Sequence, residues 1–486
     1  MNVDGERWYL RTSNFIKNMK KLDFKGSYQN SKPGVTVMWL SGISSEIFNT
    51  IFESKYSYRP DFFAYDKFPL VFTSYVLPLV LVNLGTGVIF YFLIYKLFNN
   101  HKTAILSYTL YALHPYILGM SRFLHVDSVM SNFVTLSYLT FQLYQKNDRD
   151  IKMLVISGFL YGLSILTKTQ ALVVLPIFIL SRFIYILFNN NYTFKKSSNR
   201  TVIIGKILIS KRFILPLVLL ILSASLSFTM FFPAIWINPV ETIKKIFFEA
   251  IYVARIGRSQ DNIVPFYYYL FLIRHTVSTV ITLWFLVSAS FLFVRRNCID
   301  KNTKINILNI LIFPIFYLIG VSFSVQKIDR YLLPVIPFVL IICSIFISYL
   351  KHFKISYLII LSISIIILIY SAPPNYGMYG YNNSRYSSTY GYMLKEVSDY
   401  IRVMSEKKYP NVVISGKKYS FKPFLRGNVY DTQEVGEIKE SIDFYVKEFN
   451  QELDNDIVDN YGCEYMYTVK YHKYPVYDIY KCSGKI

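Results

Sequence analysis

Long apolar runs alternate with short polar segments through most of the chain. The runs lie near 68–95, 103–120, 127–145, 153–167, 170–188, 213–235, 271–294, 305–323, 331–350 and 355–372. A helix of about 20 residues crosses the roughly 30 Å of hydrocarbon in a bilayer. The pattern therefore predicts an all-α polytopic membrane domain with about ten transmembrane helices.

Polar or amphipathic regions flank these runs. Residues 1–67 contain RWYLRTSNFIKNMKKL and VTVMWLSGISSEIFNTIF, whose apolar residues recur at helical spacing. We expect both segments to form helices that lie along the membrane interface. Residues 373–486 contain one helical pattern and several tyrosine-rich alternating segments, which predict a small α/β domain. The predicted domains are thus 1–67, 68–372 and 373–486.

The composition agrees with a membrane protein. Hydrophobic residues make up 53% of the chain and charged residues only 17%, whereas soluble domains have about 25% charged residues. The formal net charge is +22. We attribute this excess to membrane orientation and to an anionic substrate rather than to nucleic acid, because cytoplasmic loops retain Lys and Arg.

The basic loops predict an orientation. The segments at 95–102, 145–152, 189–212, 295–304 and 351–354 are all basic and are predicted to be cytoplasmic. The alternate segments, both termini and the C-terminal domain are then extracytoplasmic. In that compartment Cys463 and Cys482 can pair, but their spacing does not decide it. The start MNVDGERW has no apolar segment to carry it across, so we expect that this chain begins one helix late.

Charged residues that carry candidate chemistry fall on the predicted outer side. They are Asp4, Glu6, Arg7, Lys32, Arg122, His125, Asp127, Lys168, Arg255, Arg258, Lys327, Asp329 and Arg330.

Three of these residues have two interpretations each. Lys168 lies in ILTKTQALVVLP and either marks a turn between two spans or points at a lipid-linked phosphate. Asp127 either caps the next helix or faces a cavity. Asp329 either forms a surface ion pair, which adds only about 0–1 kcal/mol, or belongs to a site.

A carboxylate near several cations at a lipid-facing cavity has a chemical meaning. The carboxylate can take a proton from an acceptor hydroxyl or amine. The cations can hold a phosphate and stabilise the charge that it gains on leaving. This chemistry is that of sugar transfer from a polyprenyl-phosphate donor to an acceptor.

Several segments, in order, resemble one family. VDGERWYLRTSNFIKNMKKLDFKGSYQNSKPGVTVMWL is similar to the first outer loop of dolichyl-phosphate-mannose–protein mannosyltransferases and lipid A aminoarabinose transferases, which have the GT-C fold. SRFLHVD, GLSILTK, PAIWINPVETI, KIDRYLLPVIP and YGYNNSRY also resemble this group. The resemblance implies an extracytoplasmic, multi-pass membrane glycosyltransferase that lacks the family's first helix here.

The resemblance also implies roles for residues. Asp4 takes the place of the general base of an inverting transfer, although Gly5 stands where the family has Glu and the acid follows at Glu6. Lys32 takes the place of a residue that contacts the carrier phosphate. Asp127 matches the second acidic position and is, with Asp4, a candidate catalytic residue. Lys327 to Tyr331 match the late outer loop, so that Tyr331 joins the substrate-binding residues.

Other functions stay open at this point. A transporter or flippase of lipid-linked or anionic solutes is the main alternative, and it requires charges at the bilayer midplane. A polymerase or ligase of lipid-linked oligosaccharides uses similar chemistry. The expected partners are a polyprenyl-phosphate-linked sugar, a protein, lipid or glycan acceptor, and the bilayer, but no nucleic acid. No cofactor is predicted, since no His/Asp cluster has metal-ligand spacing, although a divalent metal is not excluded.

Overall fold

A computed structural model describes most of the chain in two compact units. The described residues are 3–61, 67–147, 150–189, 207–256, 265–295, 299–325, 327–350, 352–371, 394–415, 418–422, 424–438, 441–448, 453–471 and 474–483. The helical unit comprises Ser13–Trp39 and Leu79–Tyr379. The sheet unit comprises Met1–Thr12, Leu40–Pro78 and Gly380–Ile486. These boundaries differ from the predicted 1–67, 68–372 and 373–486, which stay a prediction.

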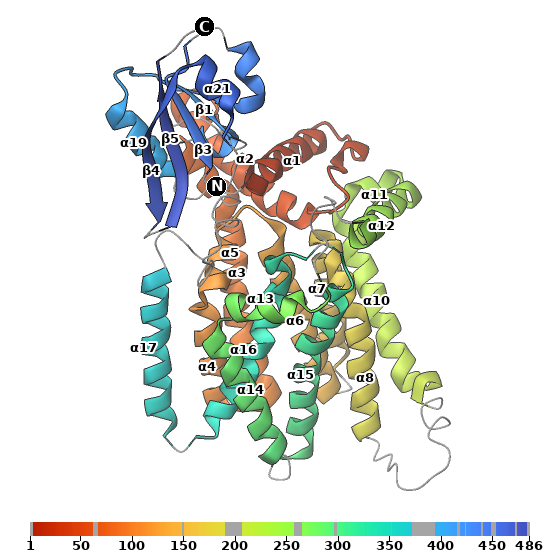
Figure 1. Cartoon of the computed structure of the whole chain (residues 1–486). Helices are drawn as coiled ribbons and strands as arrows, with labels where there is room; N and C mark the ends of the chain where they lie inside the picture. Colours follow the sequence, from red (N-terminus) through yellow and green to blue (C-terminus); the bar gives the residue numbers. More distant parts are fainter. Residues whose placement is uncertain are drawn as a thin grey trace. The chain divides into compact units, whose positions relative to one another are not determined.

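Each predicted apolar run carries helix (Figure 1). The helices over these runs are α3 (Phe68–Phe98), α4 (His101–Ala112), α5 (Pro115–Ser121), α6 (Val126–Lys146), α7 (Ile151–Thr167), η2 (Thr169–Val174), α8 (Leu175–Asn189), α10 (Lys211–Phe231), α13 (Tyr268–Thr276), α14 (Thr279–Val294), α15 (Lys301–Ser322), η4 (Asp329–Val335), α16 (Ile336–Ser348) and α17 (Phe353–Ser371). Among the described residues, five helical segments are long and apolar enough to cross a membrane.

Two of the predicted spans are broken by local backbone chemistry. Between α4 and α5 the chain leaves the helix at Leu113 and His114, and Pro115 starts a new helix at its first position, where its missing N–H costs nothing. Between α13 and α14, Ser278 has a φ of 75° and its side chain accepts a hydrogen bond from the Ile281 N–H. A hydroxyl cap of this kind favours a helix start.

Small residues bring α7 and α10 into close contact. Gly158 and Gly162 are one turn apart on α7, and a Cβ at Gly162 would lie 2.1 Å from the Ala224 backbone oxygen. Ser223 and Ser227 of α10 donate hydrogen bonds to α7 backbone oxygens, at 2.7 and 2.9 Å. Small residues at this spacing let membrane helices approach closely.

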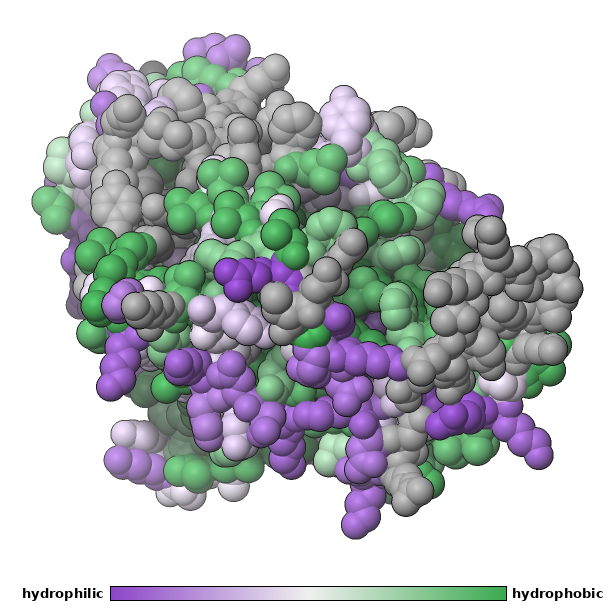
Figure 2. Space-filling model, turned by 90° about the horizontal axis from the view of Figure 1, so that it is seen from below, coloured by the Kyte–Doolittle hydropathy of each residue, from purple (hydrophilic) through white to green (hydrophobic). Residues whose placement is uncertain are grey.

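Three helix ends next to predicted basic loops lie close together in the helical unit. Lys146 at the end of α6 donates a 2.7 Å hydrogen bond to the Lys96 backbone oxygen at the end of α3. Asn306 near the start of α15 bonds to the Leu97 oxygen. Three predicted basic loops therefore adjoin one another. Seen from below, the molecule shows a cluster of hydrophilic residues that is bordered by hydrophobic ones (Figure 2).

The predicted outer loop at 236–262 contains a helix. Helices α11 (Pro233–Ile237) and α12 (Pro239–Ile256) follow α10. Ile235 and Ile246 are buried in a cluster with Phe15 and Met38, so packing of apolar side chains stabilises the helix. Both predicted N-terminal helices are also present, as α1 (Val3–Lys20) and α2 (Val35–Tyr56), joined by η1 (Lys25–Ser27). Their place at a membrane interface stays a prediction.

The sheet unit contains a five-stranded mixed sheet of order β2-β1-β3-β5-β4. Its strands are β1 (Asn411–Ile414), β2 (Asn428–Asp431), β3 (Phe444–Glu448), β4 (Cys463–Tyr471) and β5 (Tyr474–Cys482), with helices α19 (Leu394–Met404), α20 (Lys418–Phe421) and α21 (Asn455–Asn460) and the 3-10 helix η5 (Thr432–Glu437). Strand β1 is parallel to β2 and β3, whereas β5 is antiparallel to β3 and β4.

Both faces of the sheet are covered. Val412 and Ile414 pack with Val397 and Ile401 of α19 on one face, while Val413 joins a second cluster, as the alternation of side chains along a strand requires. In that second cluster a disulfide joins Cys463 to Cys482 at paired positions of β4 and β5. The predicted small α/β domain is thus present.

Candidate active site

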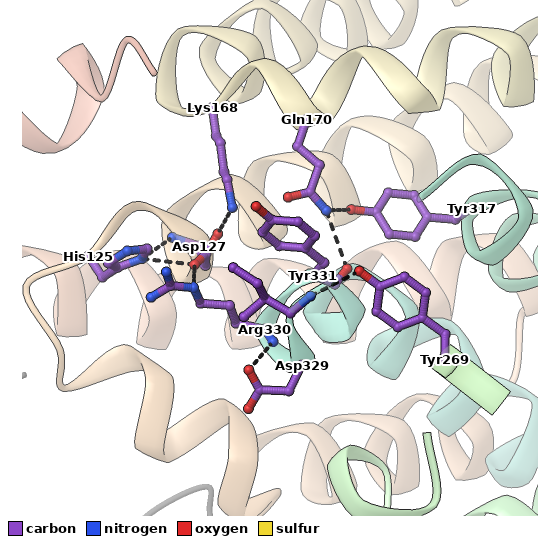
Figure 3. A network of polar contacts seen from close by, with 10 residues as sticks. His125, Asp127, Lys168, Gln170, Tyr269, Tyr317, Asp329, Arg330 and Tyr331 are labelled. Atoms are coloured by element: carbon purple, nitrogen blue, oxygen red, sulfur yellow. Dashed lines mark hydrogen bonds and ion pairs between the residues drawn. The ribbon is translucent and has the colours of Figure 1, made fainter. Parts of the chain in front are cut away.

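The centre of the candidate site is a buried carboxylate with basic partners from three chain segments (Figure 3). Asp127 is fully buried and forms an ion pair with Lys168, whose side chain is also buried. Its Oδ2 atom lies 3.2 Å from Nε of Arg330 and 2.9 Å from Nδ1 of His125. The fold brings these residues together although they are far apart in the sequence. The cluster therefore joins α6, the end of α7 and the start of η4.

Local backbone structure positions Asp127 and its neighbour. Asp127 lies in the first turn of α6 and His125 is the N-cap residue of that helix. A negative side chain is favoured there by the unpaired N–H groups of the helix start. The His125 Nδ1 atom also lies 3.3 Å from the Asp127 backbone nitrogen, but one nitrogen cannot donate to the carboxylate and accept from the N–H together. The shorter contact favours a proton on Nδ1.

Lys168 is presented by the junction of two helices. It ends α7 in an extended conformation, with φ −159° and ψ 130°, and η2 follows directly. The side chain is directed at Asp127, and Nζ lies 4.1 Å from the centre of the Tyr331 ring. A cation in this position is attracted by the ring face. Both contacts keep the ammonium group in place.

A second set of hydrogen bonds fixes η2 against η4. The Gln170 amide donates to the Tyr317 hydroxyl at 2.8 Å and to the Tyr331 backbone oxygen at 3.5 Å. The Ile328 N–H donates to the Tyr269 hydroxyl at 3.3 Å. Within η4 the buried Asp329 accepts a 2.8 Å hydrogen bond from the Arg330 N–H, which fixes the turn that carries Arg330.

A cavity of about 370 Å³ opens beside this cluster. We call it the cationic cavity; it is lined by Ser31, Lys32, Lys168, Thr169, Gln170, Leu172, Val173, Phe247, Glu249, Ala250, Ile251, Ala254, Arg255, Gly320, Val321, Phe323, Ser324 and Tyr331. Three cations and one carboxylate thus share a wall that is otherwise mostly apolar. Such a wall suits a ligand with an anionic head and an apolar tail.

Comparison with known proteins assigns the fold. Residues 69–227 match the family model described as dolichyl-phosphate-mannose-protein mannosyltransferase. ArnT from Cupriavidus metallidurans bound to undecaprenyl phosphate is similar in structure, with a TM-score of 0.54 and 12% sequence identity over 96% of this chain and 92% of that chain. The chain has the GT-C fold of membrane glycosyltransferases.

Further comparisons are weaker. The apo state of the same ArnT gives a TM-score of 0.50 at 13% identity, over 92% of this GT-C chain and 87% of that chain. The oligosaccharyltransferase AglB from Archaeoglobus fulgidus gives a TM-score of 0.44 at 13% identity, over 86% of this chain and 62% of that chain. No curated protein sequence matches this chain significantly.

The GT-C fold brings together part of the predicted site. His125, Asp127, Lys168, Arg330 and Tyr331 form the buried cluster, with Asp329 in the same turn. Lys32 and Arg255 line the cationic cavity with Lys168. These two groups are adjacent because Lys168 and Tyr331 belong to both.

The other predicted residues lie outside these two groups or outside the described part of the chain. Lys327 is half-buried and donates to the Ser324 backbone oxygen at 2.8 Å, and Arg122 is exposed at the end of α5. Glu6 and Arg7 lie on α1 within the sheet unit. The Asp4 backbone belongs to α1, but its side chain lies outside the described part, as does Arg258 entirely. The roles of all these residues stay predictions.

Sequence reasoning missed Gln170, Tyr269, Tyr317 and Glu249. Gln170 follows Lys168 by two residues, and both tyrosines lie in apolar runs where nothing distinguishes them from packing residues. Glu249 lies on α12 near Phe247, Ala250, Ile251 and Ala254, and helical periodicity of this segment was the signal that could have found it. Among the described residues, no group of three His, Cys, Asp or Glu side chains is placed to hold a metal ion.

Proposed function

We propose that the protein transfers a sugar from a polyprenyl-phosphate donor to a protein, lipid or glycan acceptor, with inversion at the anomeric carbon. The observation that supports this most strongly is the cationic cavity, in which Lys32, Lys168 and Arg255 face a mostly apolar wall. A lipid phosphate needs both features in one place. The similar ArnT structure is bound to undecaprenyl phosphate, which supports the same class of ligand here.

In this mechanism the cations act on the leaving phosphate. The acceptor hydroxyl or amine attacks the anomeric carbon, the bond from that carbon to the phosphate oxygen breaks, and polyprenyl phosphate leaves. The phosphate gains negative charge during this step, and cations fixed beside it stabilise that charge. Lys168 is fixed by Asp127 and Tyr331 before any ligand binds, so little reorganisation is needed.

A base must receive the proton that the acceptor loses. We assign this role to Asp4, on the resemblance of its segment to the first loop of the family. Asp127 is a poor candidate because its carboxylate is fully buried and surrounded by Lys168, Arg330 and His125. Its role in the proposal is to hold Lys168 and Arg330 in place.

The reaction is proposed to take place on the extracytoplasmic face. The basic loops support this orientation. The Cys463–Cys482 disulfide supports it independently, because disulfides persist in oxidising compartments and are rare in the cytosol.

A transfer assay tests the proposal. Radiolabelled polyprenyl-phosphate sugars are added to membranes that contain the wild-type protein or Asp4→Asn, and label in protein, lipid and glycan fractions is counted. We expect transfer by the wild type and its loss in Asp4→Asn, with undecaprenyl phosphate binding retained by the purified variant. Full activity of Asp4→Asn would remove the proposed base, and failure of the wild type to bind undecaprenyl phosphate would contradict the donor.

A further inference from the structure

A second cavity of about 370 Å³ lies in the helical unit. We call it the polar cavity; it is lined by Asp23, Lys25, Gly26, Tyr28, Ala234, Asn238, Glu241, Thr242 and Lys245. Its volume falls in the roughly 300–1,000 Å³ range of small-molecule sites. The function proposed above makes no use of it.

One wall of the polar cavity is a tightly organised loop. Asp23 Oδ1 accepts a 2.9 Å hydrogen bond from the Gly26 N–H. The side-chain amides of Asn18 and Gln29 both donate to the Gly26 oxygen, each at 2.6 Å. A Cβ at Gly26 would lie 2.3 Å from Asp23 Oδ2, so only glycine lets the carboxylate pack here. The loop is therefore fixed without a ligand.

Another wall is formed by Asn238 and the first part of α12. Asn238 directly precedes this helix, its backbone oxygen accepts from the Thr242 N–H, and Thr242 and Lys245 follow at helical spacing. Glu241 pairs with Lys245 at 2.7 Å, and its other oxygen lies 3.4 Å from the Asn238 amide nitrogen. Tyr28 gives the polar cavity an aromatic wall. Its ring stacks on that of Phe232, with 6.4 Å between the ring centres.

The charges of the two cavities differ in a way that selects ligands. The cationic cavity has Lys32, Lys168 and Arg255 against one lining carboxylate. The polar cavity has two carboxylates and two ammonium groups, together with an amide and two hydroxyls. Balanced donors and acceptors around one aromatic ring match a neutral ligand with many hydroxyl groups, since each hydroxyl both donates and accepts.

The two cavities are neighbours along α12. Lys245 lines the polar cavity, and Glu249, one turn further on, lines the cationic cavity. Burial raises the pKa of Tyr28, which lines the polar cavity, and the negative charge of Glu249, which lines the cationic cavity, raises it further. A saccharide in the polar cavity would thus lie next to the proposed donor.

We propose that the polar cavity binds a neutral saccharide, the sugar part of the acceptor, beside the donor site. The assignment to the acceptor rests on the proposed function, whereas binding of a neutral saccharide does not. The sugar of the donor is the other possible source of the same chemistry, and the experiment below separates the two.

Saturation-transfer NMR on the purified full chain in detergent tests the site. The probes are neutral hexoses, N-acetylhexosamines and their disaccharides, with glucuronate and a neutral hexapeptide as comparisons. We expect transfer to at least one neutral saccharide and none to the comparisons. Asn238→Ala with Glu241→Gln should weaken that binding at least about tenfold, because hydrogen bonds to a charged group are lost. Lys244→Gln, an exposed change on α12 outside the cavity, should leave it unchanged.

Each result decides the proposal. Absence of saccharide binding, preference for the hexapeptide, or unchanged binding in the double variant overturns it. Displacement of the saccharide by undecaprenyl phosphate that carries a hexose would show that the sugar occupies the donor position, which also overturns it. If saccharides bind as expected but undecaprenyl phosphate does not bind at all, the polar cavity is upheld as a saccharide site and the proposed function is contradicted.

Discussion

Lys168 and Asp127 are 41 positions apart in the sequence and form an ion pair in which both side chains are buried. Burying two charges costs solvation free energy, so such a pair is seldom a means of gaining stability alone. Here the ammonium group also lines the cationic cavity. The pair therefore fixes a cation at a place where a ligand can reach it.

Replacing Asp127 with Asn should destabilise the protein strongly. Lys168 and Arg330 would then remain buried without a counter-charge, and loss of one partner of a buried pair costs about 3–5 kcal/mol. The measurement is thermal unfolding of the purified protein in detergent. Asp399→Asn is the matched control, because Asp399 pairs with Arg402 at an exposed position where about 1 kcal/mol or less is at stake. Equal shifts for both variants would contradict the role given to Asp127.

Removing the accessible cations of the cationic cavity should weaken carrier binding. Lys32→Gln and Arg255→Gln each remove a charge from the cavity wall, and we expect about tenfold weaker binding of undecaprenyl phosphate to each. The effect should shrink as salt concentration rises, because these side chains are partly exposed to solvent. Binding is measured by titration of the lipid, with Lys244→Gln as control. Unchanged affinity in both variants would place the phosphate elsewhere.

A methyl group at Gly162 should disturb the α7–α10 contact. The added Cβ would lie 2.1 Å from the Ala224 backbone oxygen and 2.0 Å from Ser227 Oγ, so backbone must move. We expect Gly162→Ala to lower stability by about 1–3 kcal/mol. Gly85→Ala is the matched control, because no atom lies within 4 Å of its added Cβ and Ala favours helix over Gly by about 1 kcal/mol. A neutral Gly162→Ala would disprove the close contact.

Replacing Glu6 with Gln should stabilise the protein at neutral pH. Burial raises the pKa of Glu6 despite the opposing charge of Arg7, so the ionised form is disfavoured in the folded state. The stability gained by Glu6→Gln relative to the wild type should be present above the pKa of Glu6 in the folded state. It should fade as the pH falls through that pKa towards the pKa of the unfolded state, because the wild-type carboxyl then becomes neutral by itself. Unfolding temperatures at pH 7 and pH 4 measure this, with the exposed Glu464→Gln as control. A gain that is equal at both pH values would contradict the burial effect.

The Cys463–Cys482 disulfide should stabilise the sheet unit. It closes a loop of sequence separation 19, for which chain entropy predicts about 3 kcal/mol. Reduction should therefore lower the unfolding temperature of the wild type, followed by circular dichroism at wavelengths sensitive to sheet. The double variant Cys463→Ser with Cys482→Ser should unfold at the lower temperature and show no response to the reductant. A reductant effect that persists in the double variant would assign it to another group.

Most of the helices could be predicted from the sequence, because a long apolar run indicates a helix that is buried in a bilayer. The helices over all predicted runs, and the strands at 411–414, 463–471 and 474–482, follow from periodicity. The break at Ser278 could not be predicted, because serine has no strong preference against helix. The break before Pro115 was missed, although a proline disfavours the helical conformation in the residue that precedes it. Strands β2 and β3 were missed, because NVYD and FYVKE are short, mix polar with apolar residues and lack the apolar run that marks β1.

The candidate site was predicted in part. Charges in apolar surroundings, such as Asp127, Lys168 and Arg330, are expensive and so stand out in a sequence. Which of them pair could not be predicted, since that depends on the packing of α6 against α7 and η4. Residues such as Gln170 and Glu249 could not be recognised, because their surroundings become special only once the helices are packed.

The contact between α7 and α10 has a mechanical consequence. Lys168 lies at the end of α7, and α10 continues directly into α11 and then α12, which carries Arg255. The close contact at Gly158 and Gly162 thus sets how far apart α7 and α10 lie, and with them the two cations Lys168 and Arg255 in the wall of the cationic cavity. A substitution that widens this contact is therefore expected to change the spacing of these two charges.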